Sequence, residues 1–207
     1  MPGPALETIR SLRDFAVENA KSARAFLGAL GMPVRELSIV AIGEKADLLA
    51  PLRAGRALGL LSEAGCPALA DPGAQLVEAA HREGFRVVPL IGPSSIVLAL
   101  MASGLEGQRF AFCGYLPRDA GERAQRIRQL EQRSRRERET EVFIETPYRN
   151  EALLAALLES CAPATRLCVA ADLTLGTESI RTQSVAEWRR SKGTIGKRPA
   201  VFLLLAA

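Results

Sequence analysis

Residues 60–73 read LLSEAGCPALADPG, and this stretch indicates the fold more clearly than any other in the chain. The apolar residues before Ser62 are typical of a buried strand, and a helical pattern begins at Gly73. Between them lies a loop rich in glycine, proline and acidic residues. Ligands of open α/β sheets bind outside the carboxyl ends of the strands, so we expect this loop to face a ligand. The same composition is also typical of an ordinary turn between a strand and a helix.

A second loop of the same kind, PLIGPSS at residues 89–95, follows the next apolar run. Serine or proline at a helix start satisfies or tolerates the unpaired backbone N–H groups there. Both loops should therefore present helix N-termini at one edge of the sheet, which favours a ligand site more than either loop does alone. The chain contains neither G-x-G-x-x-G nor a P-loop motif, so a nicotinamide or ATP phosphate site lacks its usual support.

The chain divides into two halves near the apolar run 110–116, which passes into a polar, arginine-rich segment. We predict two small α/β domains, residues 1–108 and 109–207. Alternating strands and helices favour a mainly parallel sheet with crossover helices in the first, and the second is predicted to hold a mixed sheet with helices. The predicted strands are residues 15–18, 57–62, 85–89, 110–115, 141–145, 167–171, 179–183 and 200–205. The predicted helices are residues 5–13, 19–30, 46–53, 73–83, 94–103, 119–138 and 151–161.

Composition narrows the class of protein. A hydrophobic content of 48% over 207 residues is enough for a packed core. The four cysteines form no C-x-x-C pair, so neither a zinc site nor a disulfide framework is predicted, and a reducing cytoplasmic location is expected. No apolar stretch is long enough to cross a bilayer, and no secretory signal pattern opens the chain. His81 is the single histidine, which argues against most metal sites and against triads with a histidine base.

The formal net charge is +4, and the segment from Arg118 to Arg138 carries an equal excess, with eight arginines and four acidic residues. A basic helix of this kind is typical of a contact with RNA phosphates. It is equally typical of a solvated helix with charge pairs along one face. The segment contains no aromatic residue on which a base could stack.

Five motifs carry a resemblance to a known family, and they occur in the family's order. They are SEAGCPALADPG at 62–73, VVPLIGPSS at 87–95, RFAFCGYLP at 109–117, FIETPYR at 143–149 and AADLT at 170–174. With these motifs the chain resembles the tetrapyrrole-methylase superfamily of S-adenosylmethionine-dependent methyltransferases. Within that superfamily it is similar to the branch that methylates ribose 2′-oxygens of small-subunit ribosomal RNA.

The resemblance implies a homodimeric α/β methyltransferase that holds S-adenosylmethionine in a cleft between its two domains and methylates a substrate held there. No metal is expected, because the chain has a single histidine and no paired cysteines. Thirteen positions of the chain match the family's cofactor motifs. They are Ser62, Glu63, Ala64, Gly65, Asp71, Pro72, Gly92, Pro93, Ser94, Ser95, Ala171, Leu173 and Thr174.

Methyl transfer from a sulfonium needs alignment and exclusion of water more than covalent catalysis. A ribose acceptor also needs a base for its proton, and Glu145 and Asp172 are the candidates because both stand at predicted strand ends. Arg149, with Asn150, is a candidate for binding phosphate. The structural alternatives are that the carboxylates cap a helix or pair with Arg149.

The chain also departs from the family pattern. The family's opening strand and the proline/glycine loop after it, which forms part of the cofactor pocket, have no counterpart here, so we expect a chain shortened at its N-terminus. Glu63 and Tyr148 replace an aspartate and a histidine, and Ala171-Asp172 replaces Arg-Glu. Three functions stay open: methylation of RNA, methylation of a tetrapyrrole or other small molecule, and a non-catalytic remnant without the full cofactor site.

Overall fold

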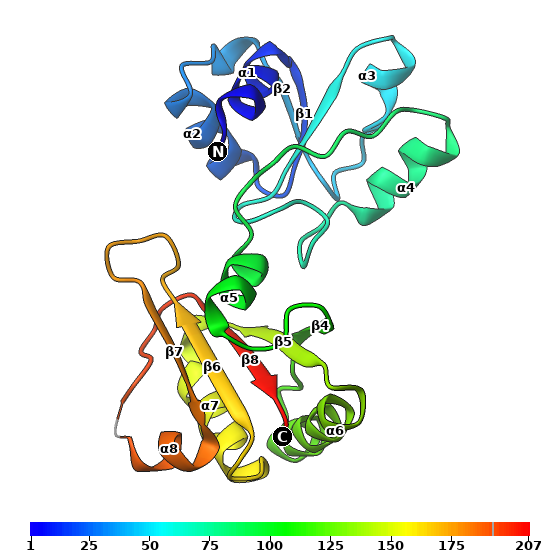
Figure 1. The fold of residues 1–207 in the computed structure, drawn as a ribbon. Helices are drawn as coiled ribbons and strands as arrows, with labels where there is room; N and C mark the ends of the chain where they lie inside the picture. The colour runs from blue at the N-terminus through cyan, green and yellow to red at the C-terminus, as the bar shows by residue number, and fades with distance from the viewer. Residues whose placement is uncertain (192) are drawn as a thin grey trace. The chain divides into compact units, whose positions relative to one another are not determined.

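The computed structural model describes residues 1–191 and 193–207. Contacts divide the chain into two compact units, Met1–Ser94 and Ser95–Ala207, each with its own sheet and helices (Figure 1). The first sheet is parallel and the second is mixed. The predicted fold class, two α/β parts with these two kinds of sheet, is confirmed.

The N-terminal unit is built on three parallel strands in the order β2-β1-β3. All four residues of the central strand β1 are buried. Ile9 of α1 and Leu27 of α2 pack with Phe15 and Val17 of β1, so both helices cover the same face of the sheet. The elements of this unit are α1 (Gly3–Ser11), β1 (Asp14–Val17), α2 (Ala20–Ala29), the 3-10 turn η1 (Val34–Glu36), β2 (Ser38–Ala41), α3 (Ala50–Arg53), β3 (Leu58–Leu61) and α4 (Ala74–Arg82).

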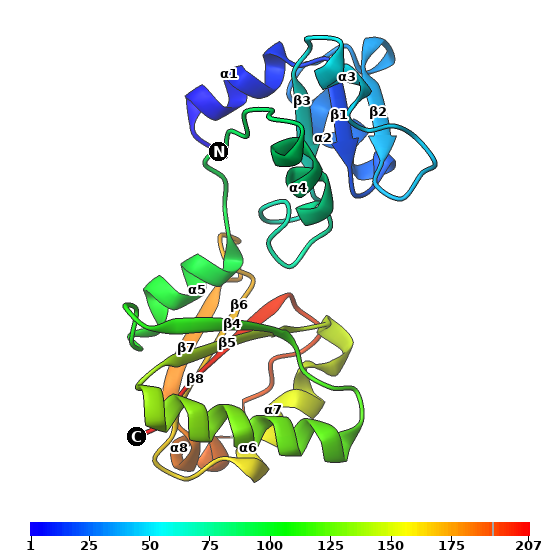
Figure 2. The same cartoon turned by 90° about the vertical axis from the view of Figure 1, so that its right-hand side faces the viewer.

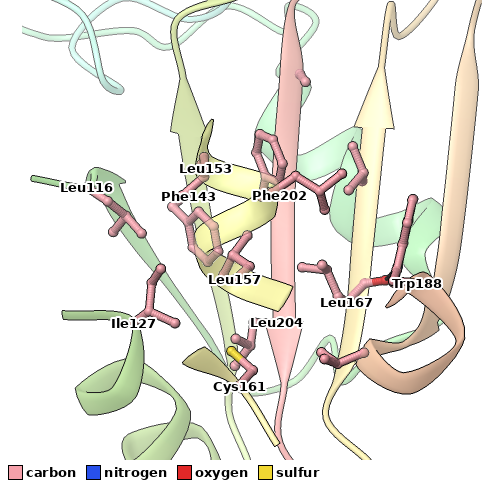
Figure 3. Packing of buried hydrophobic residues seen from close by; sticks show 14 of the residues in the cluster. Leu116, Ile127, Phe143, Leu153, Leu157, Cys161, Leu167, Trp188, Phe202 and Leu204 are labelled. Carbon is pink, nitrogen blue, oxygen red and sulfur yellow. Dashed lines mark hydrogen bonds between the residues drawn. The ribbon is translucent and has the colours of Figure 1, made fainter. Parts of the chain in front are cut away.

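The C-terminal unit has five strands in the order β4-β5-β8-β6-β7, with β8 antiparallel to both of its neighbours. Helix α5 covers one face, and α6, α7 and α8 cover the other (Figure 2). The main core lies under the second group, where the rings of Phe143 and Phe202 stack at 6.0 Å (Figure 3). The elements are α5 (Ser95–Ser103), β4 (Phe110–Tyr115), α6 (Ala120–Glu137), β5 (Thr140–Glu145), η2 (Pro147–Arg149), α7 (Asn150–Ser160), β6 (Arg166–Ala171), β7 (Ser179–Ser184), α8 (Val185–Arg190) and β8 (Ala200–Leu205).

The units divide before α5, whereas the sequence placed the division after residue 108. Ile96 and Leu100 are buried against the C-terminal sheet. In addition, Thr182 Oγ1 of β7 donates a hydrogen bond to the Ser103 carbonyl oxygen at 2.7 Å. These contacts attach α5 to the second unit. The change of composition near residues 110–117 is therefore the passage from β4 into α6 within that unit.

Two predicted elements differ from the structure, and the structure adds a strand, β2, and a helix, α8, that were not predicted. The strand predicted at residues 85–89 is wrong, because this segment pairs with no described strand and leaves Val88 55% exposed. A preference for β structure reflects packing on neighbouring strands, which is missing here. The helix predicted at 46–53 shrinks to α3, since Asp47 instead forms a turn in which its Oδ1 accepts from Leu49 N at 3.2 Å. The edge strand β2 was not predicted, because only four partly exposed residues form it.

No described helix is long and apolar enough to cross a membrane. The described residues also contain no group of three or more histidine, cysteine or acidic side chains arranged to hold a metal ion.

Candidate functional site

Three acidic residues gather where β1 and β3 end. Glu18 directly follows β1. Its backbone N–H donates to the Leu61 carbonyl oxygen at 3.0 Å, which extends the hydrogen bonding between β1 and β3 by one residue. Its Oε2 accepts a hydrogen bond from the backbone N–H of Glu63 at 2.8 Å. Burial raises the pKa of the Asp71 carboxyl, and the carboxylates of Glu18 and Glu63 raise it further. The carboxyl edge of the N-terminal sheet is therefore a concentration of negative charge and hydrogen-bond acceptors.

The two glycine/proline loops touch each other. We call residues 62–73 the first loop and residues 89–94 the second loop. The thiol of Cys66 in the first loop lies 3.5 Å from the Pro93 carbonyl oxygen and 4.0 Å from that of Gly92 in the second. The predicted proximity of the two loops is thus observed within the N-terminal unit.

The backbone of the first loop is strained. Ala68 and Ala70 have φ of 64° and 69°, in the left-handed region that costs an L-residue about 1–2 kcal/mol. Gly73 has φ of 132°, and a Cβ there would come within 2.9 Å of Leu60 Cδ2. Non-glycine residues in such conformations persist where the surroundings enforce them, and they cluster at ligand sites. The loop therefore has a shape that the alanines themselves do not favour.

Replacing both alanines with glycine is expected to stabilise the protein by about 1 kcal/mol, because glycine adopts positive φ without steric cost. The matched control is Ala79→Gly within α4, where the same change is expected to cost about 1 kcal/mol. Urea denaturation of the three proteins measures both effects. A loss of stability in the double variant as large as in the control would show that the alanines are not strained.

Ser62 supplies a buried polar atom with unmet hydrogen-bonding capacity. The Ser62 hydroxyl lies near the Asp71 carboxyl and partly offsets the rise in the pKa of that carboxyl. The hydroxyl is nevertheless not aligned for a hydrogen bond to any of the described residues. A buried hydroxyl without a partner costs free energy of about 1–3 kcal/mol. A polar ligand group seated in the first loop would satisfy it.

The second group of predicted site residues lies at one edge of the C-terminal sheet. Glu145 ends β5 and Ala171 ends β6, and both pair in register with Ala200 of β8. Because β8 runs between them, the backbones at Glu145 and Ala171 are about 10 Å apart, twice the usual spacing of strands. Asp172, which follows Ala171, is held there by a hydrogen bond from its N–H to the Pro199 carbonyl oxygen at 3.0 Å. Both candidate carboxylates therefore stand at the same edge.

Glu145 is engaged by its neighbours. Its side chain is 1% exposed, and Oε1 accepts from the backbone N–H of Thr146 at 2.7 Å. Arg149 Nη2 lies 3.1 Å from Oε2, in an ion pair that makes no aligned hydrogen bond. The pairing of this carboxylate with Arg149, one of the alternatives open at the sequence level, is thus present. Arg149 also donates to the Pro117 carbonyl oxygen at 3.4 Å.

Asp172 stands on a strained turn. Its φ is 53°, and Thr174, a β-branched residue for which positive φ is a rare outlier, has φ of 72°. Asp172 Oδ2 accepts from Thr177 Oγ1 at 2.8 Å and pairs with Arg198 Nη1 at 3.4 Å. Oδ1 receives no hydrogen bond from the residues that the structure describes. One oxygen of this carboxylate is therefore fixed and the other is left for a further partner.

The start of α7 fixes the segment that carries Arg198. The buried amide of Asn150 donates to the carbonyl oxygens of Gly196 and Arg198, at 3.1 and 2.7 Å. Glu151 Oε1 accepts from the N–H groups of Ile195 and Gly196, both at 2.8 Å. The Asn150 amide, a candidate for binding phosphate in the sequence analysis, therefore donates to backbone carbonyl oxygens instead.

The structure places the predicted residues in two groups, one in each unit. Two further residues lie beside them and were not among the predicted site residues. They are Glu18, the last residue of the strand predicted at 15–18, and Arg198, which stands just before the strand predicted at 200–205. The N-terminal group is Ser62, Glu63, Ala64, Gly65, Asp71, Pro72, Gly92, Pro93 and Ser94, and the C-terminal group is Ser95, Glu145, Arg149, Ala171, Asp172, Leu173 and Thr174.

Proteins named as ribosomal RNA methyltransferases are similar in sequence to this chain over most of its length. A protein of Mesorhizobium japonicum named Ribosomal RNA small subunit methyltransferase I is 35% identical over 183 residues, which cover 86% of this chain and 60% of the relative. Proteins of the same name from Vibrio cholerae and Escherichia coli O157:H7 are 31% and 32% identical over 186 residues, 88% of this chain and 63% and 64% of theirs. The chain spans about three fifths of the length of these relatives.

Solved structures share the fold. The methyltransferase CobJ superposes with a TM-score of 0.64 at 17% identity, over 100% of this chain and 88% of that one. Uroporphyrin-III-C-methyltransferase from Thermus thermophilus gives 0.57 at 23% identity, over 99% and 87%. The sequence profile described as Tetrapyrrole (Corrin/Porphyrin) Methylases matches residues 11–188, which include both loops and the carboxylates at the second sheet. The chain therefore belongs to the tetrapyrrole (corrin/porphyrin) methylase family.

Proposed function

We propose that the chain is an S-adenosylmethionine-dependent methyltransferase that acts on a ribose 2′-hydroxyl of small-subunit ribosomal RNA. The observation that carries the proposal is that backbone strain is concentrated in two segments of the chain. Five non-glycine residues in the described ranges have positive φ, and four of them are Ala68, Ala70, Asp172 and Thr174. These four residues lie in the two segments that match the family's cofactor motifs. Backbone strain of this kind is typical of sites that bind a ligand.

The residues present fit the cofactor. The unsatisfied Ser62 hydroxyl and the carboxylates of Glu63 and Asp71 are suited to the hydroxyl and amino groups of an adenosyl amino acid. In the C-terminal unit, considered by itself, Leu173 is a partly buried apolar side chain in a segment that matches a cofactor motif. When bound, S-adenosylmethionine supplies a methyl group that is already activated. The chain's own part is to orient the acceptor, exclude water and take the acceptor's proton, for which Asp172 and Glu145 are the candidates.

The RNA acceptor is supported by the names of the relatives and by the arginines of the segment 118–138. Some of these arginines are already engaged: Arg133 pairs with Glu139 and Glu141, and Arg136 with Glu137. Arg118 and Arg128 are exposed and form no ion pair with the described residues. Some arginines of the segment 118–138 are therefore held in ion pairs, and others are exposed and could contact phosphates. A cytoplasmic location stays a prediction of the cysteine pattern, and homodimerisation stays a prediction of the resemblance.

Changing Arg118 and Arg128 together to glutamine is expected to weaken binding of single-stranded ribosomal RNA fragments. Each lost phosphate contact should lower the slope of log K against log salt by about 0.7, because fewer counterions are released. Fluorescence anisotropy over a salt series measures the slope. Arg24→Gln with Arg35→Gln, two exposed arginines of the N-terminal unit, is the charge-matched control. Equal slopes in the two double variants would argue against the segment 118–138 as the RNA contact.

The direct test has two steps with the purified chain. Calorimetry with S-adenosylhomocysteine should give saturable binding that Gly65→Val abolishes, because Gly65 has φ of 82° and a β-branched residue would distort the first loop. Small ribosomal subunits lacking the modification should then accept labelled methyl, with the label recovered in a 2′-O-methylated nucleoside. No binding at millimolar cofactor would indicate a non-catalytic remnant. Binding with transfer only to a tetrapyrrole would keep the enzyme class and reject the RNA substrate.

A further inference from the structure

The C-terminal unit has a small pocket on the side of the β6-β7 hairpin that faces α8. Val169 of β6 pairs directly with Arg181 of β7, and both point to the face that carries Trp188. The cavity has a volume of about 70 Å³. It is lined by Val169, Ala171, Ser179, Arg181, Trp188, Gly193, Thr194, Ile195 and Arg198.

Two guanidinium groups converge on this cavity. Arg181 lies over the ring of Trp188, 4.6 Å from its centroid, and makes no ion pair with the described residues. Arg198 Nε donates to the Ile195 carbonyl oxygen at 2.7 Å, and its Nη1 pairs with Asp172 at 3.4 Å. Its Nη2 has no hydrogen-bond partner among the described residues around the pocket. None of the described residues that line the cavity is acidic, so among them one of the two positive charges is uncompensated.

The surroundings hold the two arginines in place. Trp188 is buried, and its indole N–H donates to the Leu167 carbonyl oxygen at 2.8 Å (Figure 3). This hydrogen bond fixes the ring over which Arg181 lies. A Cβ at Gly193 would lie 3.0 Å from Arg181 Nη1, so glycine leaves room for the guanidinium. Arg198 is anchored by its bonds to backbone carbonyl oxygens. Pre-positioned donors lose little freedom on binding and therefore bind an anion more tightly.

Size restricts the ligand. Pockets for drug-sized ligands are about 300 Å³ or larger, and a water molecule takes about 30 Å³ of liquid. A cavity of about 70 Å³ therefore suits a single small group rather than a nucleoside. A guanidinium offers parallel donors that match the oxygens of a phosphate, and Ser179 and Thr194 add hydroxyl donors at the rim.

We propose that the Arg181–Arg198 pocket binds a phosphate group, either free or in the backbone of a nucleic acid. This site lies on the face of the sheet covered by α8. The inference does not depend on the proposed methyltransferase activity, and it is tested without cofactor.

Trp188 is the single tryptophan of the chain, so its emission reports on this pocket. Titration with inorganic phosphate at constant ionic strength should change the emission and reach saturation, because an anion draws Arg181 away from the ring. Arg181→Gln should weaken the apparent affinity about 10-fold or more, and Arg181→Lys should weaken it less. Arg190→Gln, on the same helix as Trp188 but outside the pocket, is the matched control and should bind as the unchanged protein does.

The same titration with the dinucleotide ApA, whose only phosphate is a diester, separates the two sources. Saturation by phosphate alone identifies a free phosphate or monoester, and saturation by ApA alone identifies a nucleic-acid backbone. A response to both supports recognition of the phosphate group itself. A linear response equal to that of chloride or acetate, or equal affinities in Arg181→Gln and Arg190→Gln, would overturn the proposal. Thermal melts of each variant establish that the unit is folded.

Discussion

Replacing Arg133 with methionine is expected to lower the free energy of unfolding of the C-terminal unit by about 3–5 kcal/mol. Its partner Glu141 is fully buried, with a side chain that is 0% exposed. Arg133 Nε donates to Glu141 Oε1 at 2.7 Å, and Nη2 contacts Oε2. Burial raises the pKa of Cys113 to about 11, so the thiol stays protonated and donates to Oε2 at 3.2 Å. Without Arg133 the buried carboxylate keeps only this weak donor.

The emission of Trp188 during urea denaturation measures the effect in the unit that contains the pair. Arg128→Met is the matched control on the same helix, since its side chain is exposed, and it should change stability by less than about 0.5 kcal/mol. Arg133→Met combined with Glu141→Leu should recover most of the loss, because buried ion pairs are replaced by apolar side chains at little cost. Equal stabilities of Arg133→Met and Arg128→Met would show that Glu141 is not held as a charge.

The second large effect is on catalysis and depends on the proposed function. Asp172→Asn is expected to slow methyl transfer to RNA about 100-fold or more, because a positioned base contributes about 10²–10⁴-fold. Asparagine keeps the size of the side chain and removes its ability to take a proton. Steady-state kinetics should show the loss in kcat, with KM for cofactor changed little.

Glu145→Gln is the matched comparison at the same edge of the sheet. Glu145 already pairs with Arg149 and with the N–H of Thr146, so we expect this variant to lose less activity than Asp172→Asn. A rate within a few fold of the unchanged protein for Asp172→Asn would reject Asp172 as the base. If Glu145→Gln alone showed the large loss and a changed pH profile, the base would be Glu145.

The sequence predicted elements best where apolar runs end at clear turn residues. The run that forms β8 and the helix that forms α6 were placed almost to the residue. The segment at residues 85–89 has the same composition as a strand and failed, because pairing depends on a partner that composition does not reveal. The place of α5 was missed for a related reason: its apolar residues indicate burial but not which sheet they cover.

The sequence indicated where the two loops lie but not their geometry. Glycine and proline marked the first loop, whereas nothing in the letters of Ala68 and Ala70 indicates a left-handed backbone. The pair between Asp172 and Arg198 joins residues whose proximity depends on the register of β6 on β8, which a single sequence does not contain. Binding of S-adenosylmethionine by the predicted cofactor residues stays a prediction.

The position of β8 has a consequence for how the protein is made. This strand lies in the middle of its sheet, yet it is the last of the five strands to leave the ribosome. The three strands of the first sheet lie within residues 14–61, so that sheet can form early in synthesis. Until β8 emerges, β5 and β6 have unpaired inner edges of the kind that attracts other chains. Messages truncated before codon 200 should therefore yield nascent chains that chaperones hold and proteases remove.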